Sequence, residues 1–450
     1  MKITLGEERL VASGPRPEDS AWGYYQFPRL FRTQEGAIAV SFHNGDDVWS
    51  EIGDESKLWF LSCDEGRSWQ PRDRFLQQEC GLPLPNGDRL TAVERIGIDL
   101  SHMEAPFAIG PAILPTDRIE KSADPSCLPY PRGQLTDVWG QRVRTYLFDD
   151  LPDGVVPGGK SWELLRRPAV SQGDGTHTQT AAAVQREWAP VNWPNMGVNV
   201  SFSPDMQRAT LLPPYPLGKI KVAPDGVLWA PTYQCLGSLN PKNGAYSPYC
   251  GVCLLASEDD GHHWELRSWI NYIPDNEEYE NAFICSGYCE PDLEFMPDGS
   301  MLLLMRVTGV FLGDKEWAPS YLSRSADGGK SWSKPVRFDD VGVLPRMCRL
   351  GKKITLAVYG RPGIFVRATE DSSGLCWEPP VEVMTPSDRS GLMNQPPQRP
   401  DFHQWAGSCC NNDILPLDHN RAMIVYSDFY HLCPDGVRRK SILTRVVTVE

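Results

Sequence analysis

The chain has 450 residues, 41% of them hydrophobic, and a formal net charge of −14 at pH 7. This charge argues against a nucleic-acid partner, which would require a basic face. The residues from Met1 to Glu8 lack the basic start and apolar run of a secretion signal, and no later apolar run has the length of a bilayer span. We therefore expect a cytoplasmic protein with no membrane partner.

The 13 cysteines are an odd number, which favours free thiols in a reducing compartment over disulfides. Cys250 and Cys253 have the spacing of a metal-binding pair, and Cys285 and Cys289 follow them. However, cysteines three positions apart on a strand face opposite sides of a sheet, and no second pair of this spacing completes a four-ligand set. We expect buried thiols, with no metal site and no cofactor.

The first predicted elements are a short alternating stretch at residues 3–12 and two strands, near 27–30 and 37–42, joined by a turn at 34–36. A loop from His43 to Ser56 then leads into an apolar strand at 57–61. The last predicted strand covers residues 442–449.

The segment from Ser62 to Trp69 has the pattern Ser-x-Asp-x-Gly-x-x-Trp. Full copies recur at 257–264 and 325–332, and a looser copy with one extra residue covers 369–377. The short Asp side chain accepts hydrogen bonds from nearby backbone N–H groups, Gly tolerates positive φ, and Trp covers apolar area where the next strand begins. The pattern predicts four hairpin turns within sheets, and a recurring unit predicts a repeat architecture.

This repeat resembles the Asp box of the sialidase (neuraminidase) superfamily. The resemblance implies an all-β fold, a six-bladed β-propeller of four-stranded antiparallel blades, with residues 1–450 as a single catalytic domain. It also implies that the box aspartates are structural and lie on the outer rim, away from the catalytic face. Such a ring closes when an N-terminal strand pairs with the last blade, so we expect residues 3–12 to pair with 442–449.

The segment from about 95 to 216 contains little periodicity and many Pro and Gly residues. We interpret it as a second blade with long loop insertions, while a small inserted subdomain remains an alternative. Blades three to six each show an apolar strand, a turn with Asp or Gly, and a second apolar strand, at 218–230, 292–306, 354–363 and 413–426.

The resemblance also indicates where a site would lie. Sialidases hold the substrate carboxylate with three arginines, and use an aspartate as acid/base and a tyrosine nucleophile paired with a glutamate. Glu290 opens one predicted strand and Arg306 closes the next, like the family's glutamate and second arginine; Arg361 directly follows an apolar strand, like the third. Two guanidinium groups that contact a carboxylate in this way favour an acidic sugar.

Three positions depart from the family pattern. The first arginine of the family stands two residues before a proline, where this chain has Gln26 before Pro28. Arg29 is expected on the opposite face of the strand and is not counted as its replacement.

The acid/base residue is expected from the loop between His43 and Ser56. Glu51 and Asp54 are ranked above Asp47 for this role, because an ungapped match falls on Glu51.

The third departure concerns the nucleophile. The sequence that holds the family's tyrosine is matched here by Asn411-Asn412, and an amide cannot serve as that nucleophile. Tyr288, Tyr359 and Tyr426 lie near relevant strands, and Tyr288 is two residues before Glu290, which would place both on one face.

We therefore predict an exo-acting glycoside hydrolase that cleaves a terminal, acidic sugar from an oligosaccharide or glycoside. Glu290 would activate water while Glu51 or Asp54 protonates the leaving oxygen. Two alternatives stay open: a true exo-α-sialidase with a relocated tyrosine, and a non-catalytic carbohydrate-binding propeller. The predicted substrate-binding residues are Arg306, Arg361, Gln26, Asn411, Tyr288 and Tyr359.

Overall fold

The computed structural model describes residues 1–20, 23–45, 56–74, 76–93, 97–100, 135–136, 142–151, 160–169, 183–202, 208–216, 218–234, 237–275, 277–278, 282, 285–307, 310–312, 315–317, 319–361, 363–384 and 410–450. Within these ranges, the helical elements are α1 (Leu76–Glu79) and the 3-10 turns η1 (Pro17–Asp19) and η4 (Phe148–Asp150), besides single 3-10 positions at Ser56 and Ala282. The other regular elements are β-strands, so the all-β prediction is confirmed. No helix in this part of the chain is long and apolar enough to cross a membrane.

We number six main sheets along the chain: sheets 1, 4 and 5 contain four strands each, sheet 6 contains five, and sheets 2 and 3 are joined into one. Sheet 1 consists of β3 (Tyr24–Arg32), β4 (Ile38–Asn44), β5 (Lys57–Ser62) and β6 (Gln70–Arg72). Sheet 4 consists of β22 (Tyr288–Phe295), β23 (Met301–Val307), β26 (Ser320–Ser325) and β27 (Val336–Asp339). Sheet 5 consists of β28 (Val343–Leu350), β29 (Ile354–Gly360), β30 (Ile364–Thr369) and β31 (Val381–Met384).

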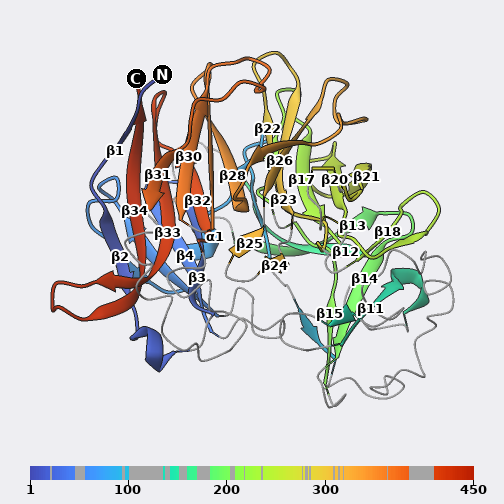
Figure 1. The fold of residues 1–450 in the computed structure, drawn as a ribbon, viewed down its shortest axis with the longest axis horizontal. Helices are drawn as coiled ribbons and strands as arrows, with labels where there is room; N and C mark the ends of the chain where they lie inside the picture. The colour runs from blue at the N-terminus through green and yellow to red at the C-terminus, as the bar shows by residue number, and fades with distance from the viewer. Residues whose placement is uncertain are drawn as a thin grey trace, which may run out of the picture.

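Sheet 6 contains both ends of the chain (Figure 1). Its strands are β32 (Asn412–Pro416), β33 (Arg421–Leu432), β34 (Arg438–Val449) and, beside β34, the N-terminal strands β1 (Ile3–Leu5) and β2 (Arg9–Ser13). Thr4 lies opposite Thr448, and Arg9 opposite Thr444. The assignment of residues 1–450 to a single domain stays a prediction.

Sheets 2 and 3 are joined into one eight-stranded sheet. Sheet 2 consists of β7 (Leu82–Pro83), β8 (Arg89–Ala92), β12 (Ser161–Arg167) and β13 (Gln185–Asn192). Sheet 3 consists of β16 (Lys221–Val222), β17 (Leu228–Tyr233), β20 (Val252–Ser257) and β21 (Trp264–Ile270). The junction is a short parallel pairing of β13 with β21, in which Val191 lies opposite Trp264.

Hydrophobic cores lie between successive sheets. Each core buries side chains of both neighbours, for example Trp162 and Trp264 between sheets 2 and 3, Leu254 and Leu303 between 3 and 4, Leu304 and Met347 between 4 and 5, Val358 and Ile424 between 5 and 6, and Val425 and Val40 between 6 and 1. Between sheets 1 and 2, the Arg89 guanidinium donates a 2.9 Å hydrogen bond to the Arg32 carbonyl. The sixth sheet thus packs back onto the first.

The four repeat turns connect the third and fourth strands of sheets 1, 3, 4 and 5, as predicted. In the first, the Ser62 hydroxyl donates to Asp64 (2.8 Å) and accepts from the Gly66 N–H (2.8 Å), while Asp64 accepts from the Ser68 N–H (2.9 Å). The turns at 257–264 and 325–332 repeat these bonds. The spacing that recurs along the chain therefore gives the same hydrogen-bonded turn each time.

Each repeat turn also packs against the preceding sheet. The turn glycines Gly66, Gly261, Gly329 and Gly374 have positive φ, and a Cβ on them would lie within 3 Å of Met423, Leu90, Trp229 and Leu302 respectively. Because these contacts belong to the second strand of the sheet before, glycine is required both by φ and by close approach.

A separate sheet lies within the region predicted to carry insertions. Its strands are β9 (Ile98–Asp99), β10 (Leu135–Thr136), β11 (Arg142–Leu147), β14 (Gly197–Phe202) and β15 (Ala209–Leu212). They have their own core, which includes Tyr146, Val200 and Phe202. Figure 1 shows β11, β14 and β15 below sheets 2 and 3, on the side away from the two chain ends. Two small hairpins complete the described strands: β18 (Ser238–Leu239) with β19 (Tyr246–Ser247), and β24 (Val310–Leu312) with β25 (Lys315–Trp317).

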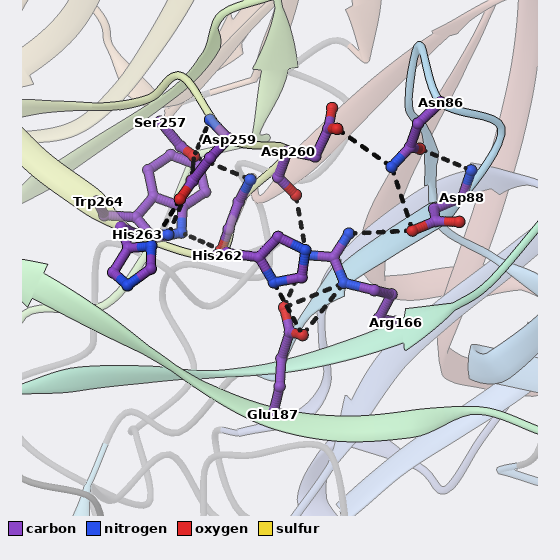
Figure 2. Close-up of polar contacts among 11 residues, drawn as sticks. Asn86, Asp88, Arg166, Glu187, Ser257, Asp259, Asp260, His262, His263 and Trp264 are labelled. Carbon is purple, nitrogen blue, oxygen red and sulfur yellow. Dashed lines mark hydrogen bonds and ion pairs between the residues drawn. The ribbon is translucent and has the colours of Figure 1, made fainter.

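A polar cluster around Arg166 fastens the turn at 257–264 onto sheet 2 (Figure 2). The buried Arg166 guanidinium bonds to Glu187 (2.7 Å) and to the carbonyl of Asp260 (2.9 Å), and lies 3.4 Å from Asp88. Asn86 donates to the Asp260 carboxylate at 3.1 Å. These contacts pair every described charge around Arg166 with an opposite charge or a hydrogen-bonding group, which is typical of a structural cluster.

Candidate active site

Glu290, Arg306, Arg361 and Gln26 lie at one end of the sheets. In an antiparallel sheet, the start of the first strand and the end of the second lie at the same end, and the turn after the third strand lies at the other. Glu290 is near the start of β22, Arg306 near the end of β23, and Cys289 lies opposite Arg306. Arg361 follows β29, and Gln26 is near the start of β3. We call this end the site end; the repeat turns lie at the opposite one.

The first strands of three sheets share a bulge at the site end. Phe27, Glu290 and Leu344 have φ of +49°, +50° and +46°, each precedes a proline, and the strand register shifts at each. The sequences are Phe-Pro-Arg-Leu, Glu-Pro-Asp-Leu and Leu-Pro-Arg-Met, at 27–30, 290–293 and 344–347. This repeated motif is a signal in the sequence that marks the site end, and it is independent of the strand alternation from which the site residues were predicted.

The bulge changes which face a side chain takes. Gln26 lies opposite His43 and Arg29 opposite Ser41, so Gln26 and Arg29 lie on the same face of sheet 1. The expectation that Arg29 faces the other way is therefore wrong, because the extra residue of the bulge breaks the simple alternation of a strand. Gln26 is itself buried, with 1% of its surface exposed.

Glu290 is held from two sides. One carboxylate oxygen, Oε2, accepts a 2.7 Å hydrogen bond from the Leu344 N–H of the neighbouring sheet and lies 3.2 Å from Arg306 Nε. The Glu290 side chain retains 16% of its exposure and that of Arg306 retains 9%. Arg306 Nε also lies 3.3 Å from the Cys289 sulfur. The carboxylate is thus fixed in direction while part of it stays accessible.

Arg361 and Asn411 lie at the same end in sheets 5 and 6. A Cβ on Gly360 would lie 3.0 Å from Cys410 Cβ, so the residues just before Arg361 and Asn411 are in contact. Asn412 Nδ2 donates to the Val343 carbonyl at 3.5 Å, next to the Leu344 amide that binds Glu290. A continuous series of contacts therefore runs from Arg306 and Glu290 in sheet 4, across sheet 5, to Asn411.

The predicted acid/base residues Glu51, Asp54 and Asp47 lie outside the described residues. The flanks of their loop are described: His43 Nδ1 and the Ser56 hydroxyl are 2.7 Å apart beside β4 and β5.

The three tyrosines lie away from Glu290. Tyr288 pairs with Val307 and packs edge-on against Tyr272 and Tyr321 in the core between sheets 3 and 4, where burial raises the pKa of its phenol. Glu290, by contrast, contacts sheet 5. The same-face expectation for Tyr288 and Glu290 is not met, because Glu290 is itself part of the bulge and has a positive φ.

Tyr359 and Tyr426 are engaged elsewhere. The Tyr359 hydroxyl donates to Asp339 at 2.6 Å, and the Tyr426 hydroxyl donates to Glu8 at 2.5 Å. Burial raises the pKa of both phenols, and the neighbouring carboxylate raises it further.

Buried charges fill the region between the first strands. Asp413 of β32 accepts from the Leu30 N–H of β3 (2.8 Å) and pairs with Lys219 (2.7 Å). Asp292 of β22 accepts from the Met347 N–H of β28 at 2.6 Å. Each aspartate has no exposed surface, and each ties its own sheet to the next.

Lys221 of β16 contacts two of these first strands, β22 of sheet 4 and β28 of sheet 5. Its ammonium lies 3.4 Å from Asp292, 2.8 Å from Glu294, and 3.0 Å from the Met347 carbonyl. Burial alone would lower the pKa of Lys221, but Asp292 and Glu294 raise it above its ordinary value. We call Lys219, Lys221, Asp292, Glu294 and Asp413 the axial charge cluster.

No cluster of three or more potential ligands for a metal ion occurs among the described residues. Cys250, Cys253, Cys285 and Cys289 are buried thiols that form no disulfide, in agreement with the expectation of buried thiols.

No protein-family model and no curated protein matches this sequence. Solved structures with a similar fold include a protein of unknown function from Dyadobacter fermentans (16% identity, TM-score 0.49, covering 100% of this chain and 99% of that one). They also include an α-L-arabinanase from Penicillium chrysogenum in complex with arabinobiose (11% identity, TM-score 0.42, 98% of both chains). A sialidase from Trypanosoma rangeli shares 12% identity at a TM-score of 0.40, over 94% of this chain and 54% of that one. All three TM-scores are below 0.5, and these similarities do not establish a function for this chain.

Proposed function

We propose that this chain is an exo-acting glycoside hydrolase that cleaves a terminal acidic sugar, and that sheets 1 to 6 are the six blades of a sialidase-like propeller. One observation carries the proposal: the partly exposed Glu290 carboxylate, bonded to the Leu344 N–H and paired with Arg306, lies at the same end of the sheets as Arg361. A fixed carboxylate beside guanidinium groups suits attack on a sugar that itself carries negative charge.

In this mechanism Glu290 is the general base. It removes a proton from water, which attacks the anomeric carbon, while a carboxylic acid protonates the leaving oxygen. Glu51, Asp54 and Asp47 are our candidates for that acid. Arg306 orients Glu290, and Arg361 holds the sugar's carboxylate, with Gln26 and Asn411 as neutral contacts. A base that acts through water leads to inversion at the anomeric carbon.

The contacts of the tyrosines favour this mechanism over a relocated tyrosine nucleophile. Tyr359 donates its hydroxyl to Asp339 between sheets 5 and 4, and Tyr426 donates its hydroxyl to Glu8 within sheet 6. Tyr288 lies in the core on the opposite face from Glu290.

The test is hydrolysis of a panel of aryl glycosides of acidic and neutral sugars, with fluorogenic sialoside included. We expect turnover of an acidic glycoside, with Glu290→Gln lowering kcat about 100-fold to 10,000-fold, the range for a general base. NMR of the first-formed anomer should show inversion. Hydrolysis that survives Glu290→Gln would contradict the proposal, and sugar binding without turnover would indicate a carbohydrate-binding propeller instead.

A further inference from the structure

Asn412 begins the first strand of sheet 6 and is fully buried. Its amide nitrogen Nδ2 donates to the Cys410 carbonyl at 3.1 Å and to the Val343 carbonyl of sheet 5 at 3.5 Å. Two carbonyl groups on one side of the amide require N–H donors there, so these contacts also determine which way the amide is turned.

A single peptide unit connects Asn412 to Glu290. The Val343 carbonyl and the Leu344 N–H belong to this unit, which is planar. Asn412 bonds to its oxygen, and its N–H donates to Glu290 Oε2 at 2.7 Å. Since the two groups of a trans peptide point in opposite directions, Asn412 and Glu290 hold the unit from its two sides. Polarisation along such a chain of hydrogen bonds strengthens each of them.

The backbone around this peptide unit is strained. Leu344 has a φ of +46° and precedes Pro345, whose ring restricts the backbone of the residue before it. A side chain that is not glycine is disfavoured in this left-handed region. The ladder between β28 and β29 is interrupted at the same place, because the register shifts between Val343 and Arg346. The direction of the Leu344 N–H therefore depends on the hydrogen bonds at both sides of the peptide unit.

The position of Asn412 is unfavourable for a polar side chain. Its Oδ1 atom is buried and has no hydrogen-bonding partner in the described part of the chain. Cys410 and Ile414, two residues before and after it, belong to the apolar core between sheets 5 and 6. A buried amide oxygen without a partner destabilises a fold, and a leucine of similar size would avoid that cost. The amide is therefore explained by the bonds that its nitrogen donates.

We propose that Asn412 is a positioning residue for Glu290 and acts through the Val343–Leu344 peptide. Asn412 keeps this peptide turned so that the Leu344 N–H meets the Glu290 carboxylate, and it thereby fixes the direction in which the carboxylate faces the sugar. Asn412 itself touches no substrate, because it is fully buried. This role rests on the proposed function only for the chemistry that Glu290 performs.

Hydrogen exchange tests the connection without any need for activity. The exchange rates of the Leu344 and Met347 N–H groups are measured in the wild type and in Asn412→Leu, which keeps the volume and removes the donor. Met347 is a reference on the same strand, because its N–H donates to Asp292 at 2.6 Å. We expect Leu344 to exchange about tenfold faster in the variant, as for the loss of one hydrogen bond, with Met347 unchanged.

The matched control is Asn420→Leu. Asn420 Nδ2 donates to the Val449 carbonyl at 3.4 Å, in the same sheet but at the end that carries the repeat turns. This change should leave the exchange of Leu344 as it is in the wild type. Equal acceleration of Leu344 and Met347 in Asn412→Leu, or no acceleration of either, would overturn the role of Asn412.

Kinetics test the effect of positioning on the reaction. Asn412→Leu should lower kcat about fivefold to tenfold with KM unchanged, because the substrate contacts remain while Glu290 loses its fixed direction. Asn420→Leu should change neither constant. A rise in KM at constant kcat would contradict the positioning role. Should Asn412→Leu not fold, Asn412→Ala takes its place in both experiments.

The two proposals fail on different measurements. Selective exchange at Leu344 in a protein that cleaves no glycoside would support the connection from Asn412 to Glu290 and contradict the hydrolase function. Cleavage that depends on Glu290 and is unaffected by Asn412→Leu would support the hydrolase function and overturn the positioning role.

Discussion

The junction of sheets 2 and 3 and the junction of sheets 4 and 5 use charge in different ways. At the first, Arg166 is 4% exposed in its side chain and is bound by Glu187, Asp88 and the Asp260 carbonyl, at the end that carries the repeat turns (Figure 2). At the second, Glu290 keeps 16% exposure and bonds through one oxygen to sheet 5 and Arg306, at the site end. A charge enclosed by partners fixes a structure, whereas a charge held on one side remains available to a ligand.

The largest effect is expected at the junction of sheets 2 and 3, from Trp264→Ala. Trp264 has no exposed surface, packs on Trp162, and donates its indole N–H to the Gly261 carbonyl at 3.0 Å. Loss of a buried Trp costs about 3–5 kcal/mol of unfolding free energy, which urea unfolding would measure. Trp188→Ala on the same sheet is the control, since Trp188 is 37% exposed and should cost much less. Similar losses for the two would show that this core is not what holds the junction.

The second-largest effect is expected from removal of the Arg166 guanidinium, shown in Figure 2. Arg166→Met leaves Glu187 and Asp88 without their partner, and breaking a buried pair costs about 3 kcal/mol, less where the carboxylates are partly exposed as here. Thermal and urea unfolding should show the loss. Arg267→Met, which removes a surface pair with Glu258, should change stability by less than about 1 kcal/mol. Activity per folded molecule should stay unchanged in both variants, and a selective loss in Arg166→Met would mean that this junction communicates with the site.

At the site end, Arg361→Met should weaken the binding of the substrate and leave the stability of the fold unchanged. A hydrogen bond to a charged group contributes about 1.5–3 kcal/mol, which corresponds to a rise in KM of about tenfold to 100-fold. Arg361→Lys should recover part of that loss, because charge is retained while the planar fork is not. The measurement is KM for an acidic glycoside against its neutral analogue. An equal rise for both sugars would remove Arg361 from recognition of the carboxylate.

The smallest effect is expected on the stability of a repeat turn at acidic pH. Hydrogen bonds from Ser68 and Ser62 lower the pKa of Asp64 from 3.8 to about 2. Since the folded pKa is below the unfolded one, the stabilisation is complete above about pH 4 and is lost as pH falls toward 2. The melting temperature of Asp64→Asn should therefore lie below that of the wild type at pH 6 and converge with it near pH 2. A constant difference across this range would show that the turn is insensitive to the charge of Asp64.

The sequence predicted the parts of the fold that depend on local patterns. The four turns follow from the spacing of Ser, Asp, Gly and Trp, and the strands around them follow from apolar runs. The five-stranded insert sheet was not separated from its surroundings, because its strands are paired across long stretches of chain and lack a repeat. The parallel pairing of β13 with β21 involves two residue pairs, and no pattern in the sequence of either strand predicts it.

The site was predicted as far as a strand follows simple alternation. Glu290 and Arg306 were paired correctly in space by their positions at neighbouring strand ends. Arg29 and Tyr288 were placed on the wrong faces, because a bulge adds a residue that alternation does not count. The axial charge cluster was not predicted, because its ion pairs join strands of different sheets and the sequence does not show which strands become neighbours. The repeated Pro-Arg or Pro-Asp pair was the available clue.

Lys219 and Lys221 extend from the start of sheet 3 to carboxylates of sheets 6 and 4, and Lys221 also binds the Met347 carbonyl of sheet 5. Two side chains that lie one residue apart on either side of Ile220 therefore cross-link sheets whose strands are more than 60 residues away in the sequence, so a change at either lysine would reach more than one sheet at once.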